Sequence, residues 1–157
     1  MKQKVFSFAD RFYIKDEEGK DKYYVEGELF SWGKKLHVYD ESGHEAAFIQ
    51  QKVFSFLPRF YVYIEGQEIA EIVKEFTFFK ASYRIEGLNW SVKGDFWDHE
   101  YEIYEGSNFV VSISKHWFTW GDSYVIDIAD HVDERNALAV VLAIDAVIAQ
   151  ANAAASN

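Results

Sequence analysis

Aromatic and β-branched residues alternate with polar residues in short runs along most of the chain. Residues 3–13 read QKVFSFADRFY and residues 51–61 read QKVFSFLPRFY, so that nine of eleven positions are identical at an offset of 48. A looser form of this pattern, two aromatics around a small or hydroxyl residue and then an alternating run, starts at residues 6, 30, 54, 76, 96 and 117. Alternation with a period of two, rich in these residue types, is typical of β-strands. The pattern therefore predicts six hairpin-like repeats.

Polar turns with glycine separate the repeats, at residues 16–19, 40–43, 65–66, 86–87 and 105–106. Two strands in each repeat give twelve antiparallel strands over residues 1–128. Because a closed sheet has no unpaired edge, we expect these strands to form a closed barrel. The repeated aromatic residues are expected to pack in the core and across strands.

The period changes after Asp130. Residues 137–149 are rich in alanine and leucine, contain no glycine or proline, and are apolar on every face. A helix of this kind is buried, either in a protein core or in a bilayer. Thirteen residues span about 20 Å, less than the roughly 30 Å of a hydrocarbon layer, and Asp145 interrupts the run. We therefore predict a core helix over residues 133–151, threaded through the barrel, with a tail at 152–157.

Asp145 is predicted to be a buried polar residue. A buried charge has to be paired or hydrogen-bonded. The favoured interpretation is a structural bond to an arginine, lysine, tyrosine or tryptophan on a strand. A functional carboxylate with a raised pKa is the alternative.

The composition limits the class of protein. A length of 157 residues with 49% hydrophobic and 18% aromatic residues fits a single domain over residues 1–157. The absence of cysteine excludes a disulfide scaffold and a thiolate metal site. A net charge of −10 argues against nucleic acid as a partner. No apolar segment follows the lysines at the N-terminus, so a cytoplasmic location is expected.

Candidate chemistry is sparse. The five histidines are scattered, and the sequence has no phosphate-binding glycine loop and no nucleophile motif, so we predict no catalytic residue and no cofactor. The densest polar cluster spans residues 95–100, from Asp95 to Glu100, and includes His99. It is interpreted as a solvated turn, with a metal or acid–base site as the alternative.

Several segments resemble a known family. They are residues 4–8 (KVFSF), 24–27 (YVEG), 52–56 (KVFSF), 83–87 (YRIEG) and 92–96 (VKGDF), together with the Ile144–Asp145 pair in the apolar tail. The chain resembles the LURP-one-related proteins of the tubby C-terminal-like superfamily, which also includes the phospholipid scramblases. The resemblance implies a twelve-stranded barrel around a hydrophobic C-terminal helix.

The resemblance also implies two binding roles. Tubby proteins bind phosphoinositides through basic residues on the barrel. Scramblases carry an acidic calcium segment just before the helix, which corresponds here to residues 121–130 and makes Asp122, Asp127 and Asp130 the metal candidates. Their spacing along a strand favours solvated acids over a calcium site, because calcium needs several oxygens at one point.

Taken together, the sequence predicts a non-enzymatic, cytoplasmic binding module that engages a protein partner or a lipid headgroup on the barrel surface. The net charge of −10 disfavours binding to an anionic membrane. Two alternatives stay open. One is an enzyme or metal-binding protein that uses the cluster at residues 95–100, and the other is a small-molecule carrier with an open lumen.

Overall fold

A computed structural model describes residues 2–6, 11–28, 31–78, 81–96, 98–115 and 123–156. The described part is mainly β, with one C-terminal helix. The strands are β1 (Lys2–Phe6), β2 (Arg11–Lys15), β3 (Asp21–Gly27), β4 (Lys35–Asp40), β5 (Glu45–Gln51), β6 (Arg59–Ile64), β7 (Gln67–Lys74), β8 (Tyr83–Glu86), β9 (Trp90–Asp95), β10 (Glu100–Glu105), β11 (Asn108–Lys115) and β12 (Ser123–Ile128).

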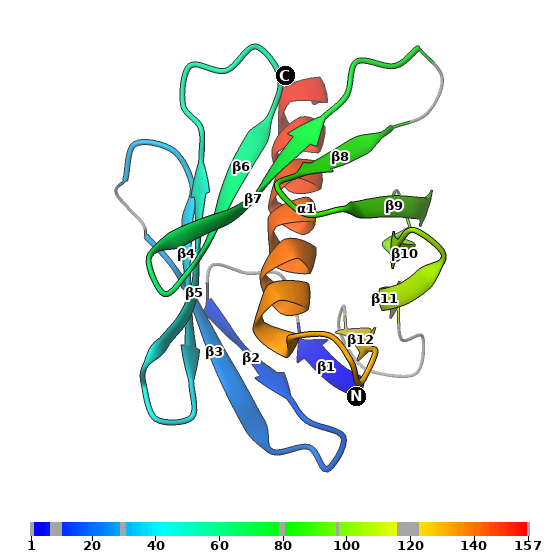
Figure 1. The fold of residues 1–157 in the computed structure, drawn as a ribbon. Helices are drawn as coiled ribbons and strands as arrows, with labels where there is room; N and C mark the ends of the chain where they lie inside the picture. Colours follow the sequence, from blue (N-terminus) through cyan, green and yellow to red (C-terminus); the bar gives the residue numbers. More distant parts are fainter. Residues whose placement is uncertain are drawn as a thin grey trace.

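The sheet has two antiparallel arms, which curve around the helix (Figure 1). Strands β2 to β8 form an arm of seven strands, and β9 to β12 form an arm of four. Strand β1 joins the arms, since it pairs with β12 on one side and with β2 on the other. The pairing with β2 covers only the positions Lys4–Lys15 and Val5–Ile14, so the junction between the arms is narrow.

The predicted twelve-stranded closed barrel is wrong. The hydrogen-bonded order begins at β8 and ends at β9, and no ladder joins these two strands in the described part of the chain. Strand β8 has only four residues, and β9 has no fully buried residue that would fix its register against the core. Side chains bridge the gap instead, with the rings of Tyr83 and Phe96 4.6 Å apart.

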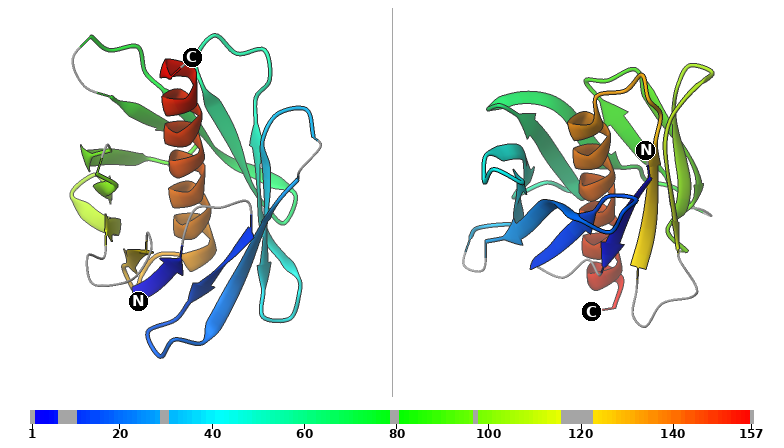
Figure 2. Two further views of the ribbon diagram at one scale, coloured as in Figure 1. Left: turned by 180° about the vertical axis from the view of Figure 1, so that it is seen from behind. Right: turned by 90° about the horizontal axis from the view of Figure 1, so that it is seen from below.

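Helix α1 (Glu134–Ala155) lies on the concave side of the curved sheet (Figure 2). It begins at Asp133, whose side chain accepts a hydrogen bond from the backbone N–H of Arg135, as expected of an N-cap. The helix packs chiefly against β5, β6 and β7. By length and composition it could cross a membrane, but 72% of its most apolar window is buried inside the protein.

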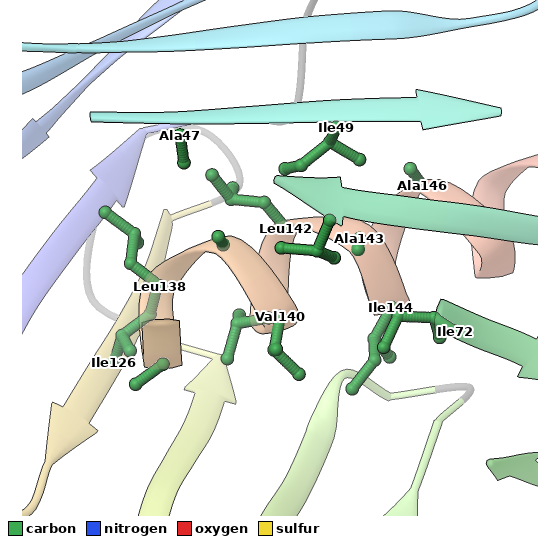
Figure 3. Close-up of a cluster of buried hydrophobic side chains, with 14 of the residues drawn as sticks. Ala47, Ile49, Ile72, Ile126, Leu138, Val140, Leu142, Ala143, Ile144 and Ala146 are labelled. Atoms are coloured by element: carbon green, nitrogen blue, oxygen red, sulfur yellow. The ribbon is translucent and has the colours of Figure 1, made fainter. Parts of the chain in front are cut away.

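The core forms where the helix meets the inward residues of the strands. Figure 3 shows Ile144 beside Ile72, and Leu138 beside Ile126 of the other arm. Inward positions alternate with outward ones along β2, β4 and β6, as the sequence pattern predicts. Because α1 occupies the concave side, the structure offers no open lumen to a small-molecule carrier over the residues that it describes.

Candidate functional site

Three loops of the seven-strand arm lie at one end of the sheet. In an antiparallel meander, the connections that follow odd-numbered strands all lie at the same end. The β3–β4, β5–β6 and β7–β8 connections therefore lie at the same end of the sheet, the end toward which the C-terminus of α1 points (Figure 1). Ring contact between Trp32 and Phe54, with centroids 6.4 Å apart, joins the first two of these loops.

These loops expose large aromatic side chains. The exposed fraction is 80% for Trp32, 93% for Phe54, 96% for Phe56, 70% for Phe76 and 84% for Phe78. We call these five residues the aromatic rim. They are the leading aromatics of the repeats, so the prediction that the repeated aromatics pack in the core is wrong for them. Within the rim, the rings of Trp32 and Phe54 are in contact, and the ring centroids of Phe76 and Phe78 lie 5.3 Å apart. Exposed apolar groups of this kind are typical of interaction surfaces.

Charge is distributed unevenly between the two ends of the sheet. The loops of the rim and the adjoining strand ends carry more basic than acidic residues, with Lys34, Lys35, Lys52, Arg59 and Lys74 against Glu28 and Glu75. The turns at the opposite end, near the N-terminus of α1, are acidic. Their acidic residues are Asp16, Glu17, Glu18, Asp40, Glu41, Glu65, Glu86, Glu105, Asp130 and Asp133. Much of the negative charge therefore lies away from the rim.

Asp145 lies in the interior below the rim. It is 5% exposed and is the buried charged residue of the described core. Its Oδ1 lies 2.8 Å from Nδ1 of His99, which belongs to the β9–β10 connection. Burial raises the pKa of the Asp145 carboxyl, while His99 and the charge of Lys34 partly oppose that rise. A cavity of about 30 Å³, lined by Lys34 and apolar side chains, adjoins this carboxyl.

His99 has a left-handed backbone, with φ of +53°. A non-glycine residue in that region is uncommon, and here its ring turns inward to Asp145 and packs 5.1 Å from the ring of Tyr124. The sequence placed both residues among the candidates but did not pair them. The partner of Asp145 is therefore a histidine of the β9–β10 connection and not the arginine, lysine, tyrosine or tryptophan that we expected on a strand.

The described residues of the cluster, 95–96 and 98–100, do not converge on one point. Asp95 closes a turn, where its Oδ1 lies 3.4 Å from the backbone nitrogen of Asp98, and His99 points to Asp145. No group of three or more histidine, aspartate or glutamate side chains that could hold a metal ion occurs among the described residues.

The acidic segment before the helix is only partly described. Asp122 lies outside the described residues. Asp127 points outward from β12 between the buried residues Ile126 and Ile128, and Asp130 is exposed in the turn that follows. Solvated acids stay the prediction for these residues, with a calcium site as the disfavoured alternative.

The protein belongs to the class of mainly β folds in which a curved antiparallel sheet surrounds a C-terminal apolar helix, and it exposes aromatic loops at one end of the sheet. The chain belongs to the LURP-one-related family, because the family model matches residues 1–145. The resemblance to the LURP-one-related proteins is thereby confirmed.

The chain is also similar to two other proteins, one in sequence and one in fold. The chain is 41% identical over 148 residues to the uncharacterized protein YxjI of Bacillus subtilis, a match that covers 94% of this chain and 91% of that protein. The fold is similar to the X-ray structure of a protein from Arabidopsis thaliana. The TM-score is 0.65 and the sequence identity 17%, over 93% of this chain and 90% of the other.

Proposed function

We propose that the protein is a non-enzymatic binding module that docks on an anionic membrane surface through the aromatic rim. The observation that carries the proposal is the exposure of five large aromatic side chains on three neighbouring loops. Aromatic rings favour the interface between lipid headgroups and acyl chains, where the apolar ring is buried and the surroundings stay partly wet. A rim of rings on short loops suits shallow insertion into that layer.

Basic residues beside the rim support the choice of an anionic surface. A lysine or arginine near such a surface contributes about 1 kcal/mol. Lys52 is exposed, and no ion pair of the Lys74 ammonium occurs among the described residues. The cytoplasmic location that we predict from the sequence would bring these side chains to the anionic leaflet.

The net charge of −10 does not oppose this docking as strongly as the sequence alone indicates. The strands β3 to β7, which run between the rim and the acidic turns, have six to eight residues each and so separate the two ends by about 20–26 Å at roughly 3.3 Å per residue. Salt at physiological strength screens charges over about 8 Å. The acidic end therefore contributes little to the potential at the rim, and its repulsion favours an orientation with the rim toward the membrane.

Vesicle binding tests the proposal. The double variant F54N/F56S removes two rim aromatics, and asparagine suits the left-handed backbone at Phe54, where φ is +59°. Full burial of a phenylalanine contributes about 1.5–3 kcal/mol, so that two side chains in a partly wet layer contribute about 3 kcal/mol. Binding to vesicles of phosphatidylcholine and phosphatidylserine should fall by about a hundredfold.

The control is Tyr13→Ser, which removes a half-exposed aromatic from the outer face of β2. It should bind the same vesicles like the original protein, and both variants should keep the original unfolding midpoint. Equal vesicle binding by F54N/F56S and the original protein would refute membrane docking. A protein partner that binds the original chain but not F54N/F56S, with no vesicle binding by either, would assign the rim to protein recognition instead.

A further inference from the structure

A groove lies at the end of the sheet opposite the rim, beside the β2–β3 and β4–β5 turns (Figure 1). Its larger part is a hollow of about 460 Å³, whose lining includes the side chains of Tyr13, Tyr24, Asp40 and Glu41. A second hollow, of about 340 Å³, shares Asp40 and Glu41 with the first. The two hollows therefore adjoin, and we call them together the tyrosine groove.

The groove presents an open aromatic ring. Tyr13 is half-exposed, and among the described residues it is the exposed large aromatic that lies outside the rim. It pairs across the sheet with Tyr24, at 5.0 Å between ring centroids, and Tyr24 in turn pairs with Tyr39. Cross-strand packing accounts for the two inner rings of this row. Tyr13, at the end of the row, keeps half of its surface for a ligand, and the face of such a ring attracts cations.

The turns that border the groove are acidic. Residues 16–20 and 40–44 contain five acidic residues and one lysine. Like charges on neighbouring turns repel one another, and a positively charged partner relieves that repulsion. Complementary charge also steers a partner toward the surface and sets its orientation. The charge around the groove therefore favours a cationic partner.

Asp40 is the acid of the groove that is available to such a partner. Its Oδ1 accepts hydrogen bonds within the turn from the hydroxyl and backbone N–H of Ser42 and from the backbone N–H of His44. These bonds hold the pKa of Asp40 below its ordinary value, so that the carboxylate is charged at neutral pH. Its Oδ2 has no hydrogen bond or ion pair with the part of the chain that the structure describes.

Two lysines also line the groove. Lys22 is directed to Glu134, at 2.7 Å, and its charge is offset there. Lys20 lies 3.0 Å from Oε1 of Glu41, but both of these side chains are more than half exposed. An exposed ion pair of this kind contributes little to stability, so an incoming cation replaces it easily.

We propose that the tyrosine groove binds an arginine-rich segment of a partner protein, through guanidinium groups that stack on Tyr13 and pair with Asp40. Arginine suits both contacts, because its planar group stacks on aromatic rings and bonds to carboxylates, whereas the lysine ammonium is a compact, strongly hydrated charge. Acids spread over two turns match several basic residues in a row better than one small cation. The proposal goes beyond membrane docking and does not depend on it. A protein docked through the rim would hold the groove away from the membrane, open to a partner.

The test measures the binding of a fluorescently labelled peptide of alternating arginine and glycine residues, by anisotropy and without vesicles. An exposed cation–ring contact and an exposed ion pair are each expected to change affinity about two- to fivefold. The double variant Y13S/D40N should therefore bind the peptide about tenfold more weakly than the original protein. Asparagine at position 40 keeps Oδ1 as the acceptor for the turn, and unfolding midpoints near that of the original protein verify folding.

The ring and the charge are separated by single variants. A peptide of alternating lysine and glycine should bind the original protein about two- to fivefold more weakly than the arginine peptide, and Tyr13→Ser should remove this preference. Tyr13→Phe keeps the ring and should stay within about twofold of the original protein. Lys20→Gln removes the competing ammonium and should raise the affinity about two- to fivefold.

Two controls leave the groove intact. Glu105→Gln removes one acidic charge at the same end of the molecule but on the four-strand arm, and F54N/F56S removes two rings at the rim. Both should bind the arginine peptide like the original protein. A loss in Glu105→Gln as large as that in Asp40→Asn would show that the peptide responds to the overall charge of this end and would overturn the groove.

The remaining outcomes are also decisive. Equal affinity of Y13S/D40N and the original protein for the arginine peptide would overturn the proposal. Self-association of the original protein in sedimentation, abolished both by Y13S/D40N and by F54N/F56S, would assign the groove to the basic rim of a second copy and would likewise overturn it. Membrane docking would survive failure of the peptide assay, because vesicle binding depends on the other end of the sheet.

Discussion

The buried contact between Asp145 and His99 leads to a prediction about stability. Replacing Asp145 by alanine removes the acceptor for Nδ1 of His99, whose side chain is only 23% exposed. Replacing it by asparagine keeps a neutral acceptor of similar shape. An unpaired buried polar group costs about 1–3 kcal/mol, so Asp145→Ala should be less stable than Asp145→Asn by that amount. For a chain of 157 residues this corresponds to about 2–10 °C in the unfolding midpoint.

The charge of Asp145 sets the direction of the pH dependence. Burial raises the pKa of this carboxyl above its ordinary value of 3.8, although His99 and Lys34 partly oppose that effect. The stability that comes from the protonated carboxyl is fully present below about pH 4 and is lost as the pH rises through the raised pKa. At pH 7, the free energy of unfolding of Asp145→Asn should therefore be no more than about 1 kcal/mol below that of the original protein.

The assay is unfolding in urea followed by tryptophan fluorescence, at intervals between pH 4 and pH 8. The difference in free energy of unfolding between the original protein and Asp145→Asn isolates this carboxyl from the others that titrate. His99→Ala in both backgrounds completes a double-mutant cycle. If Asp145→Asn lost clearly more than about 1 kcal/mol at pH 7, the ion pair would be net stabilising and the reasoning would be refuted. Equal stability of Asp145→Ala and Asp145→Asn would refute a role for the hydrogen bond.

Two further predictions concern the sheet. Burial lowers the pKa of His37, but hydrogen bonds from its two ring nitrogens to Glu45 and Glu28, at 2.6 and 2.9 Å, outweigh this and raise it. The stabilisation is present below about pH 6.5 and is lost as the pH rises through the raised pKa, and His37→Gln should remove this pH dependence of the unfolding midpoint. Gly87→Ala should cost about 2 kcal/mol or more in urea unfolding, because a Cβ there would lie 2.6 Å from the carbonyl oxygen of Ile69 and φ is +92°. Gly19→Ala, with φ of +85° and open space around it, is the matched control and should cost only about 1 kcal/mol. Equal losses in the two glycine variants would contradict the steric argument.

The repeats predict the strands better than they predict the loops. The second half of each repeat lies in an even-numbered strand with its first and third residues buried. These pairs are Phe12 and Ile14, Leu36 and Val38, Phe60 and Val62, Tyr83 and Ile85, Tyr101 and Ile103, and Tyr124 and Ile126. Strict alternation carries that information, because a residue and its second neighbour face the same side of a strand. The first half of the repeat alternates as well. In the third and fourth copies, however, it lies in a loop, the β5–β6 connection and the β7–β8 connection respectively.

Composition cannot separate a buried aromatic from an exposed one when both follow the same pattern. Phe54 and Phe60 are the same residue type six positions apart in the same repeat, but one is 93% exposed and the other is fully buried. The left-handed backbone of Phe54 and the proline at position 58 turn the chain between them. Pro58 was the available signal for a loop, since proline rarely occurs within a central strand.

Closure of the sheet could not be predicted from single strands. Pairing of β8 with β9 would need alignment over several residues, whereas β8 contains four residues and Gly87 turns the chain against the backbone of β7. The contact between His99 and Asp145 likewise depends on tertiary structure. The two residues are 46 positions apart, and neither belongs to a sequence motif that predicts the other. Buried Asp145 itself was predicted, because a charge within an apolar helix has to lie somewhere in the core.

The distribution of charge follows from the topology of the meander. Acidic residues occur in the turns after even-numbered strands, and the basic residues near the rim occur in the connections after odd-numbered ones. A sum over the chain adds these two ends together and gives −10, a value that describes neither of them. A membrane or a charged partner meets the potential within about one Debye length of the contact, not the net charge. The sequence contained the segregation in its alternating turns, and it becomes an argument about function only once the order of the strands places all the odd connections at one end.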